Sequence, residues 1–197
     1  MRLISGRFKG FELQTPKSGT RPTTDFAKEG IFSHLEAENM LAGASVLDLY
    51  AGTGALGFES LSRGATALTL VDSTPRAASL LRQAATRIRS HRSWDPAMSV
   101  SVERIPAERY VQRLARTETD RPSFDLVFLD PPYALLDEEF DAVMASLAAT
   151  GTLTDVCEIV AERSAQSRAP RPPQGWEIEE TRKYGETRIY YIVRTQD

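Results

Sequence analysis

Residues 46–57 have the sequence VLDLYAGTGALG, in which an apolar run leads directly into a turn that contains three glycines. The apolar run predicts a short buried strand over 46–49, and the pattern of 58–63 continues as a helix. Glycines at a strand-to-helix turn let the backbone approach a ligand closely, and the helix N-terminus offers free N–H groups. This stretch therefore predicts a ligand-binding turn in an α/β protein.

Strand and helix patterns alternate on the C-terminal side of this turn. Further strands are predicted over 67–71, 98–104, 124–129 and 157–161, and helices over 75–89, 107–116 and 137–149. Alternation with short connections is typical of βαβ units on a parallel sheet. Two last strands, over 176–182 and 188–193, are too close together for a helical crossover and must pair antiparallel.

The N-terminal part has a different pattern. Short strands are predicted over 2–6 and 11–15, joined by the turn RFKG, and a helix is predicted over 24–39 after a loop rich in turn residues. We therefore expect two units. Residues 1–40 form a small β-hairpin and helix extension, and residues 41–197 form a Rossmann-like α/β domain with a mostly parallel seven-stranded sheet.

Composition narrows the class of protein. No stretch approaches the roughly 18 apolar residues of a membrane span, and the N-terminus lacks the apolar region of a secretory signal. Cys157 is the only cysteine and lies in an apolar run, which favours a buried thiol in a reducing compartment. No cluster of Cys and His suggests a metal site. We expect a cytoplasmic monomer without a metal or a membrane partner.

The net charge of −3 is unevenly distributed along the chain. Residues 1–34 carry six basic and three acidic side chains, whereas residues 35–160 carry eleven basic and eighteen acidic ones. A basic segment on an acidic body can serve as an arm that contacts phosphates. Chance clustering on a solvated surface explains the charge alone equally well.

Two cofactors fit the glycine-rich turn. The spacing of Gly52, Gly54 and Gly57 matches the dinucleotide fingerprint, and Asp72 ends the next predicted strand 18 residues after Gly54. Asp48, inside the strand before the turn, favours S-adenosylmethionine, because a carboxylate attracts its ammonium group and repels a pyrophosphate. A backbone-capping role for Asp48 is the alternative. The candidate cofactor residues are Asp48, Ala51, Gly52, Thr53, Gly54, Asp72 and Ser73, with Ala107 and Glu108 as adenine contacts. For Glu108, a role as a first-turn helix acid is equally consistent.

The tetrapeptide Asp130, Pro131, Pro132, Tyr133 follows a predicted strand. Two prolines cannot continue a strand, so they form a rigid turn at the ligand edge of the sheet. The Asp130 carboxylate and the Pro131 carbonyl are two acceptors that can hold the hydrogens of an exocyclic base amine. Tyr133 can stack on a base that is flipped out of a helix. The residues predict a catalytic turn for amine methylation, and a plain strand-ending turn is the alternative.

These motifs together resemble one family. The segments VLDLYAGTGALGFESLSRGA, LVDS, FDLVFLDPPY, RPTTDFAKEGIF and YGETRIYY are similar to the RsmD family of bacterial 16S ribosomal RNA guanine-N2 methyltransferases, over nearly the whole chain. The resemblance implies a Rossmann-like class I S-adenosylmethionine-dependent methyltransferase fold, with the target guanine held by Asp130–Tyr133. It also implies 16S rRNA as the partner, naked or within the small ribosomal subunit.

The resemblance further implies that the N-terminal hairpin and the RPTT loop contact RNA. The candidate contacts are Arg7, Lys9, Arg21, Thr23 and Lys28. Lys28 stands where the family usually has arginine, and it keeps the charge without the planar fork of a bidentate contact. Three rival interpretations stay open on the sequence, namely an adenine-N6 DNA methyltransferase, a non-catalytic RNA-binding protein on a methyltransferase fold, and an NAD-dependent oxidoreductase.

Overall fold

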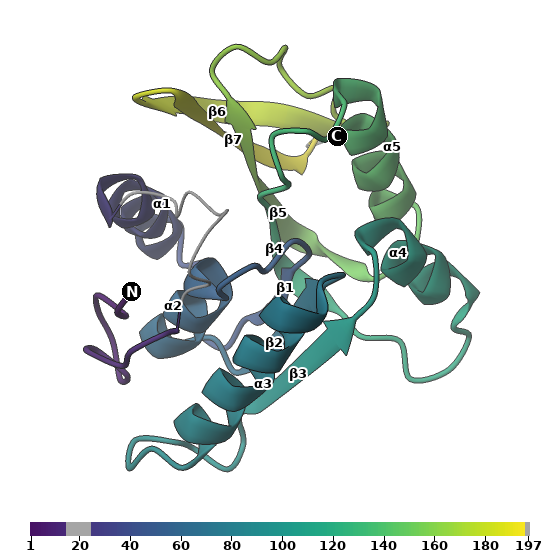
Figure 1. Cartoon of the computed structure of the whole chain (residues 1–197). Coiled ribbons are helices and arrows are strands. Elements are labelled where there is room, and N and C mark those ends of the chain that lie inside the picture. The colour runs from purple at the N-terminus through teal and green to yellow at the C-terminus, as the bar shows by residue number, and fades with distance from the viewer. Residues whose placement is uncertain (15–24, 196–197) are drawn as a thin grey trace.

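Apolar residues on both sides of the central strands allow helices to cover both faces of the sheet. The computed structural model, which describes residues 1–14 and 25–195, has a seven-stranded sheet in the order β3-β2-β1-β4-β5-β7-β6 (Figure 1). The strands are β1 (Ser45–Asp48), β2 (Ala67–Asp72), β3 (Ser99–Arg104), β4 (Phe124–Leu129), β5 (Leu153–Ser164), β6 (Trp176–Tyr184) and β7 (Thr187–Arg194).

The pairing directions agree with the predicted alternation. Neighbours from β3 to β5 pair in parallel, and β7 pairs antiparallel with both β5 and β6. The helices are α1 (Asp25–Ala37), α2 (Ala55–Arg63), α3 (Pro75–Arg89), α4 (Ala107–Arg116) and α5 (Asp137–Ala148). The expected α/β class, with a mostly parallel seven-stranded sheet and an antiparallel C-terminal hairpin, is confirmed.

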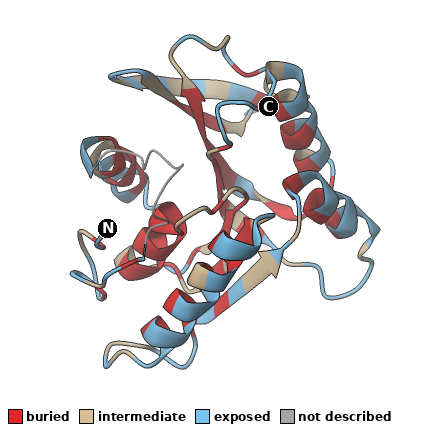
Figure 2. Ribbon diagram, in the orientation of Figure 1, coloured by how far each residue is buried: buried red, intermediate tan, exposed pale blue. Residues whose placement is uncertain are grey.

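Alternate residues of each strand enter two separate hydrophobic layers. On β1, Val46 packs with α1, α2 and α3, whereas Leu47 packs with α4 and α5. On β4, Phe128 joins the first layer and Val127 the second. Figure 2 shows the result as buried inner faces of the helices on either side of a buried sheet.

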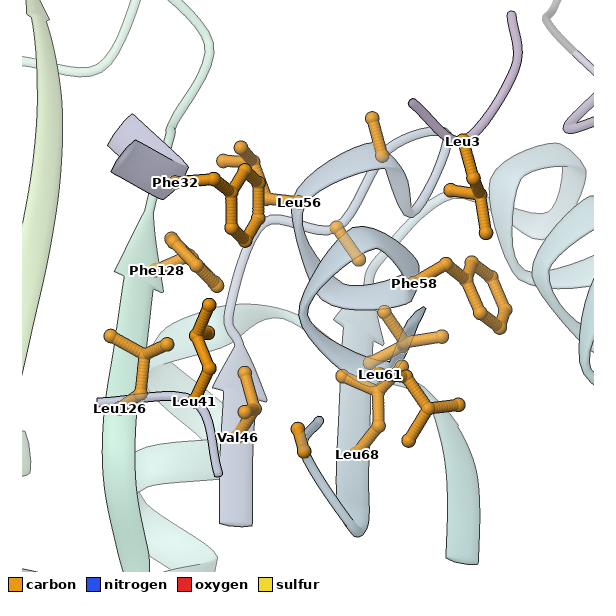
Figure 3. Packing of buried hydrophobic residues seen from close by; sticks show 14 of the residues in the cluster. Leu3, Phe32, Leu41, Val46, Leu56, Phe58, Leu61, Leu68, Leu126 and Phe128 are labelled. Atoms are coloured by element: carbon orange, nitrogen blue, oxygen red, sulfur yellow. The ribbon is translucent and has the colours of Figure 1, made fainter. Parts of the chain in front are cut away.

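The N-terminal segment shares the first of these layers. Figure 3 shows apolar side chains from the arm, α1, α2 and the strands directed into one cluster, among them Leu3, Phe32, Leu56, Phe58, Val46, Leu68 and Phe128. The rings of Phe32 on α1 and Phe128 on β4 are 6.1 Å apart. This core runs across residue 40, and the expected domain boundary there stays a prediction.

Residues 1–14 fold back on themselves, but the expected strands are wrong. The arm has one antiparallel bridge, Arg2 with Glu12, and neither 2–6 nor the described part of 11–15 is a regular strand. The reason lies in where the backbone donors go. Ile4 N and Ser5 N donate to the Glu59 carboxylate on α2, at 2.8 and 3.0 Å, instead of to a partner strand. The arm pairs with itself through Leu3 N to the Phe11 carbonyl and Leu13 N to the Met1 carbonyl, at 3.0 and 2.9 Å, and it is also attached to α2.

Most other expected bounds agree closely, and β5 is the main exception. A strand over 157–161 was expected, and β5 extends from Leu153 to Ser164. Its end is charged, and the residues Glu162–Ser164 are strand because they pair with β7. The burial and the hydrogen-bond partners of these residues come from β7, which is distant in the chain. The local sequence pattern therefore could not predict this end of the strand.

Glu59 is the buried group that attaches the arm, with no exposed surface and with Arg63 Nε at 2.8 Å from its carboxylate. Replacing it by glutamine leaves the guanidinium without its buried anion and turns an amide N–H toward backbone donors. We expect Glu59→Gln to lower the free energy of unfolding by about 3–5 kcal/mol, measured by urea denaturation. The exposed Glu118→Gln is the matched control and should change it little. Equal midpoints for the two variants would contradict this attachment.

Candidate active site

The glycine-rich turn connects β1 to α2 at the carboxyl edge of the sheet. Gly52 has φ +52°, and a Cβ atom there would meet only the Tyr50 carbonyl oxygen, at 3.9 Å. At Gly54, where φ is +77°, a Cβ atom would lie 2.7 Å from Phe58 and 2.8 Å from Leu81. The two glycines therefore serve different purposes. Gly54 is required by internal packing, whereas Gly52 leaves open space in front of the backbone for a ligand.

Asp72, at the end of β2, is bonded to the same turn. Its Oδ2 accepts a hydrogen bond from Gly52 N at 3.0 Å, and its Oδ1 accepts from Thr74 N and Thr74 Oγ1, both at 2.8 Å. Asp72 is half-buried and the neighbouring Ser73 is exposed. A carboxylate has about four lone-pair sites, so Asp72 can organise the turn and still accept from hydroxyl groups of a ligand.

Asp48 lies behind the turn, with an exposed fraction of 2%. Its Oδ2 accepts a hydrogen bond from Gly57 N at 3.1 Å, so it caps the first turn of α2. Burial raises the pKa of Asp48 to about 7, the negative charge of Asp72 adds to the rise, and the Gly57 hydrogen bond opposes it. The structure thus places Asp48 in the backbone-capping role that the sequence left open. Direct contact with a cofactor stays a prediction.

The loop after β3 meets the loop after β1. Ala107 is buried at the start of α4, and Glu108 is exposed in its first turn. Burial raises the pKa of Tyr50 above its ordinary value, with Glu108 and Glu139 adding to the rise and Arg163 opposing it. The Tyr50 hydroxyl is buried without a hydrogen-bond partner among the described residues.

The Asp130–Tyr133 turn continues directly from β4. Asp130 is half-buried, Pro131 is buried and Pro132 is exposed, while 58% of Tyr133 is accessible to solvent. Leu135 N donates to the Pro132 carbonyl at 2.9 Å and closes the turn. Because β1 pairs with β4, with Asp48 opposite Phe128, this turn begins next to the glycine-rich turn. The two motifs that the sequence singled out are brought together.

Arg163, near the end of β5, holds the segment that follows the Asp130–Tyr133 turn and was missed by the sequence reasoning. Its Nη2 donates to the Leu135 carbonyl at 3.0 Å and to Asp137 Oδ1 at 2.7 Å. Its guanidinium lies 4.8 Å from the centroid of the Phe140 ring. The hydrogen bond from Arg163 lowers the pKa of Asp137. No sequence signal pointed to Arg163, since an arginine in a predicted loop carries no periodicity.

The predicted RNA contacts have mixed outcomes. Arg7 and Lys9 are exposed on the arm. Arg21 and Thr23 lie outside the described residues. Lys28 is fully buried, and its Nζ lies 3.4 Å from Asp25 Oδ1 without a hydrogen-bond partner among the described residues. The prediction of a surface contact at Lys28 is therefore wrong for this conformation, because α1 turns that face inward. Its spacing from Phe32 and Leu35 was a usable signal.

Two further features concern metals and membranes. Among residues 1–14 and 25–195, no group of three or more His, Cys, Asp and Glu side chains could hold a metal ion. Within the same part of the chain, no helix is both long and apolar enough to cross a membrane.

Cys157 is buried, and burial raises the pKa of its thiol, as expected for a structural cysteine.

Comparison with known proteins agrees with this geometry. Residues 1–193 match the model of a family described as Conserved hypothetical protein 95. The chain belongs to this family. It is 32% identical to Ribosomal RNA small subunit methyltransferase D of Escherichia coli K12 over 197 aligned residues, which cover 96% of this chain and 89% of the relative. The resemblance to the RsmD family is confirmed.

Solved structures of other proteins show the same fold. A putative methyltransferase from Escherichia coli superposes with a TM-score of 0.79 at 27% identity, covering 98% of this chain and 97% of that one. Magnesium protoporphyrin IX methyltransferase from Synechocystis, solved with bound S-adenosylmethionine, has a TM-score of 0.61 at 16% identity, covering 89% and 87%. This chain therefore has the class I methyltransferase fold, as expected.

The raised pKa of Asp48 has a consequence for stability. The folded state holds a proton on Asp48 that the unfolded state loses near pH 4, so this contribution to stability is lost as the pH rises from about 4 through about 7. Asp48→Asn stays neutral at every pH. We expect the free energy of unfolding of the variant, relative to the native protein, to improve by on the order of 4 kcal/mol between pH 4 and pH 8.

Urea denaturation at a series of pH values measures this difference. The exposed Asp155→Asn provides the matched control and should give a difference from the native protein that is flat with pH. A flat difference for Asp48→Asn as well would mean that its carboxyl is ionised and solvated in the folded protein.

Proposed function

We propose that this chain transfers a methyl group from S-adenosylmethionine to the N2 amine of a guanine in 16S rRNA. The observation that carries the proposal is the position of the Asp130–Tyr133 turn, which leaves β4 beside the glycine-rich turn that leaves β1. A cofactor turn and an amine-holding turn at one sheet edge are what methylation of an exocyclic amine requires. The name of the Escherichia coli relative supports ribosomal RNA as the substrate.

The residues around the glycine-rich turn fit S-adenosylmethionine. The open space at Gly52 admits a ligand against the backbone. At the N-terminus of α2, Asp48 accepts from Gly57 N, and the N-cap residue Gly54 has no side chain to cover the turn from the ligand side. Asp72 has lone pairs left for ribose hydroxyls. The proposed cofactor contacts are Asp48, Ala51, Gly52, Thr53, Gly54, Asp72, Ser73, Ala107 and Glu108. The Synechocystis enzyme with the same fold, solved with this cofactor, is consistent with the proposal.

The chain's own part in the reaction is to position the amine. S-adenosylmethionine, when bound, supplies an electrophilic methyl group whose bond to sulfur breaks as the bond to nitrogen forms. Asp130 and the Pro131 carbonyl accept the hydrogens of the amine, which directs its lone pair outward. Positive charge that develops on nitrogen is stabilised by the carboxylate. The proton leaves after transfer, because the nitrogen becomes acidic only once it is methylated.

The RNA contacts in this proposal begin at the arm. Arg7 and Lys9 are exposed there, and we propose that they pair with phosphates, together with Arg21 and Thr23. Tyr133, more than half exposed next to Pro132, offers its ring to the target base. We propose the small ribosomal subunit or its RNA as the partner of a monomeric enzyme.

The cofactor can be tested without RNA. S-adenosylhomocysteine at 100 times its dissociation constant should stabilise the protein by about 2.7 kcal/mol, and NAD should not, since its pyrophosphate is repelled by the Asp72 carboxylate. A thermal shift assay with both ligands at equal concentration measures this. Stabilisation by NAD alone would favour an oxidoreductase. Asp72→Ala should weaken binding of S-adenosylhomocysteine by about 1–3 kcal/mol in calorimetry.

The amine-holding role of Asp130 is tested by Asp130→Asn. Asparagine keeps the shape, but it has lost the charge and can present a donor to the amine. We expect the single-turnover rate of methyl transfer to fall at least about a hundredfold, the loss expected for removing one preorganised electrostatic contact. Affinity for S-adenosylhomocysteine should stay nearly unchanged. The variant Asp155→Asn, on the opposite edge of the sheet, is the control.

Tyr133→Ala separates base stacking from chemistry. It removes a stacking surface worth about 1–3 kcal/mol per base and should weaken RNA binding as well as the rate. A single-turnover rate near that of the native protein for Asp130→Asn, with saturating RNA, would rule out the carboxylate from the chemistry.

A further inference from the structure

A second pocket adjoins the catalytic turn and has no part in the steps described above. It has a volume of about 850 Å³, within the roughly 300–1,000 Å³ of typical ligand sites. Three segments line it, namely the turn 133–137, the end of β5 with its loop over 163–167, and the β6–β7 turn around Gly185. Tyr133 lines the pocket and is also the last residue of the Asp130–Tyr133 turn, so the pocket begins where that turn ends.

The walls of this pocket are held in place by contacts between the three segments. Ala165 N donates to the Glu186 carbonyl at 2.7 Å, which ties the loop after β5 to the β6–β7 turn. Arg163, with only 4% of its side chain exposed, bonds to the Leu135 carbonyl and to Asp137 on the opposite wall. On the other side of the β6–β7 hairpin, the ring of Tyr184 packs edge-on against Phe26 of α1 at 5.7 Å. The pocket is thus formed before any ligand enters.

The pocket combines an apolar wall with neutral polar groups. Tyr133 and Leu136 are large side chains that are 58% and 62% exposed, and they offer apolar surface to a ligand. Ser164, Gln166 and Ser167 supply donors and acceptors without charge. Such walls suit the flat face and polar edge of a nucleobase.

Of the two cations in the pocket, Arg163 is paired and Lys183 is not. The guanidinium of Arg163 is paired with Asp137, which also lies 4.0 Å from Arg168 Nε. Glu186 has a contact of its own. Lys183 is exposed in the wall and forms no ion pair with any residue of 1–14 or 25–195. An unpaired ammonium beside stacking surfaces is the combination that binds a nucleotide of a single strand, through its phosphate and its base.

We propose that this pocket binds the nucleotide next to the target base in the RNA strand, with Lys183 paired to its phosphate. The proposal rests on the proposed function, because it requires the target base to lie at Asp130–Tyr133. It assigns a role to the turn of residues 183–186, which takes no part in methyl transfer and in which Tyr184, Gly185 and Glu186 begin the YGETRIYY motif of the family resemblance. The base of the bound nucleotide lies against Leu136 and the polar side chains after β5.

The test compares Lys183→Ala with Arg116→Ala. Arg116 is an exposed cation at the C-terminal end of α4, on the opposite edge of the sheet. The probe is a fluorescein-labelled single-stranded RNA of twelve nucleotides, uridine-rich with one guanine, and its anisotropy is measured at several salt concentrations without cofactor. We expect Lys183→Ala to weaken binding about three- to tenfold and to reduce the salt slope by about 0.7, the value for one phosphate contact on a single strand. Arg116→Ala should change affinity less than about twofold, as for an exposed charge that contacts no phosphate.

A modified probe identifies the phosphate. A methylphosphonate next to the guanine removes one backbone charge, so it should weaken binding to the native protein and have no further effect on Lys183→Ala. Equal affinity and equal salt slopes for Lys183→Ala and Arg116→Ala would overturn the proposal. So would a methylphosphonate effect that persists in Lys183→Ala.

Failure of this inference and failure of the proposed function give different results. Binding is measured without methyl transfer, and transfer is measured separately with radiolabelled S-adenosylmethionine and rRNA. If the native protein transfers a methyl group to guanine N2 and Lys183→Ala keeps the native KM for RNA, the pocket is not an RNA subsite and the function stands. If Lys183 controls binding of RNA but no methyl group is transferred, the proposed function fails and the RNA site stands.

Discussion

The parallel pairing of β1 with β4 is the constraint on which the rest of the site depends. In the chain, β2 and β3 separate these strands, yet in the sheet Val46 lies opposite Leu126 and Asp48 lies opposite Phe128. With β2 on its other side, β1 is the point where the strand order reverses direction. Loops that leave such a pair diverge and leave a crevice at the carboxyl edge, where open α/β sheets bind ligands. The glycine-rich turn and the Asp130–Tyr133 turn are those two loops.

Buried ionisable groups hold the segments around this crevice. Glu59 fixes the arm to α2, and Arg163 fixes the segment after the Asp130–Tyr133 turn to β5. A third group attaches α1 to the sheet, where His34 lies 2.9 Å from Glu158 and 3.2 Å from Glu180. Burial raises the pKa of Glu158, and the neighbouring His34 opposes the rise. Ionic groups without solvent are costly and contribute little net stability. They do fix geometry, because each donor has only one arrangement that satisfies it, and a methyl-transfer site requires fixed geometry.

The local sequence pattern was sufficient to predict the bounds of elements that are defined by their own residues. The bounds of α3, α4 and β4 agree with those expected, because amphipathic spacing and flanking turn residues define them within the chain. The pattern failed where a distant partner supplies the stabilisation. Backbone donors of the arm bind Glu59 on α2 instead of forming the expected strands. The charged end of β5 is strand because it pairs with β7. Lys28 is buried because it lies on the inner face of α1. Arg163 belongs to the same group, since its role depends on a turn 28 residues away.

The sequence by itself determined the fold class, the family and the two motifs at the ligand edge, because glycine spacing, proline pairs and strand periodicity are local properties of the backbone. Only the tertiary structure decided what the charged side chains do. Asp48 became a buried cap for α2, Lys28 became a buried cation, and Arg163 and Lys183 came to line one pocket. The physical reason is that the free energy of a charge depends on burial and on its partners, and both are set by residues far away in the chain.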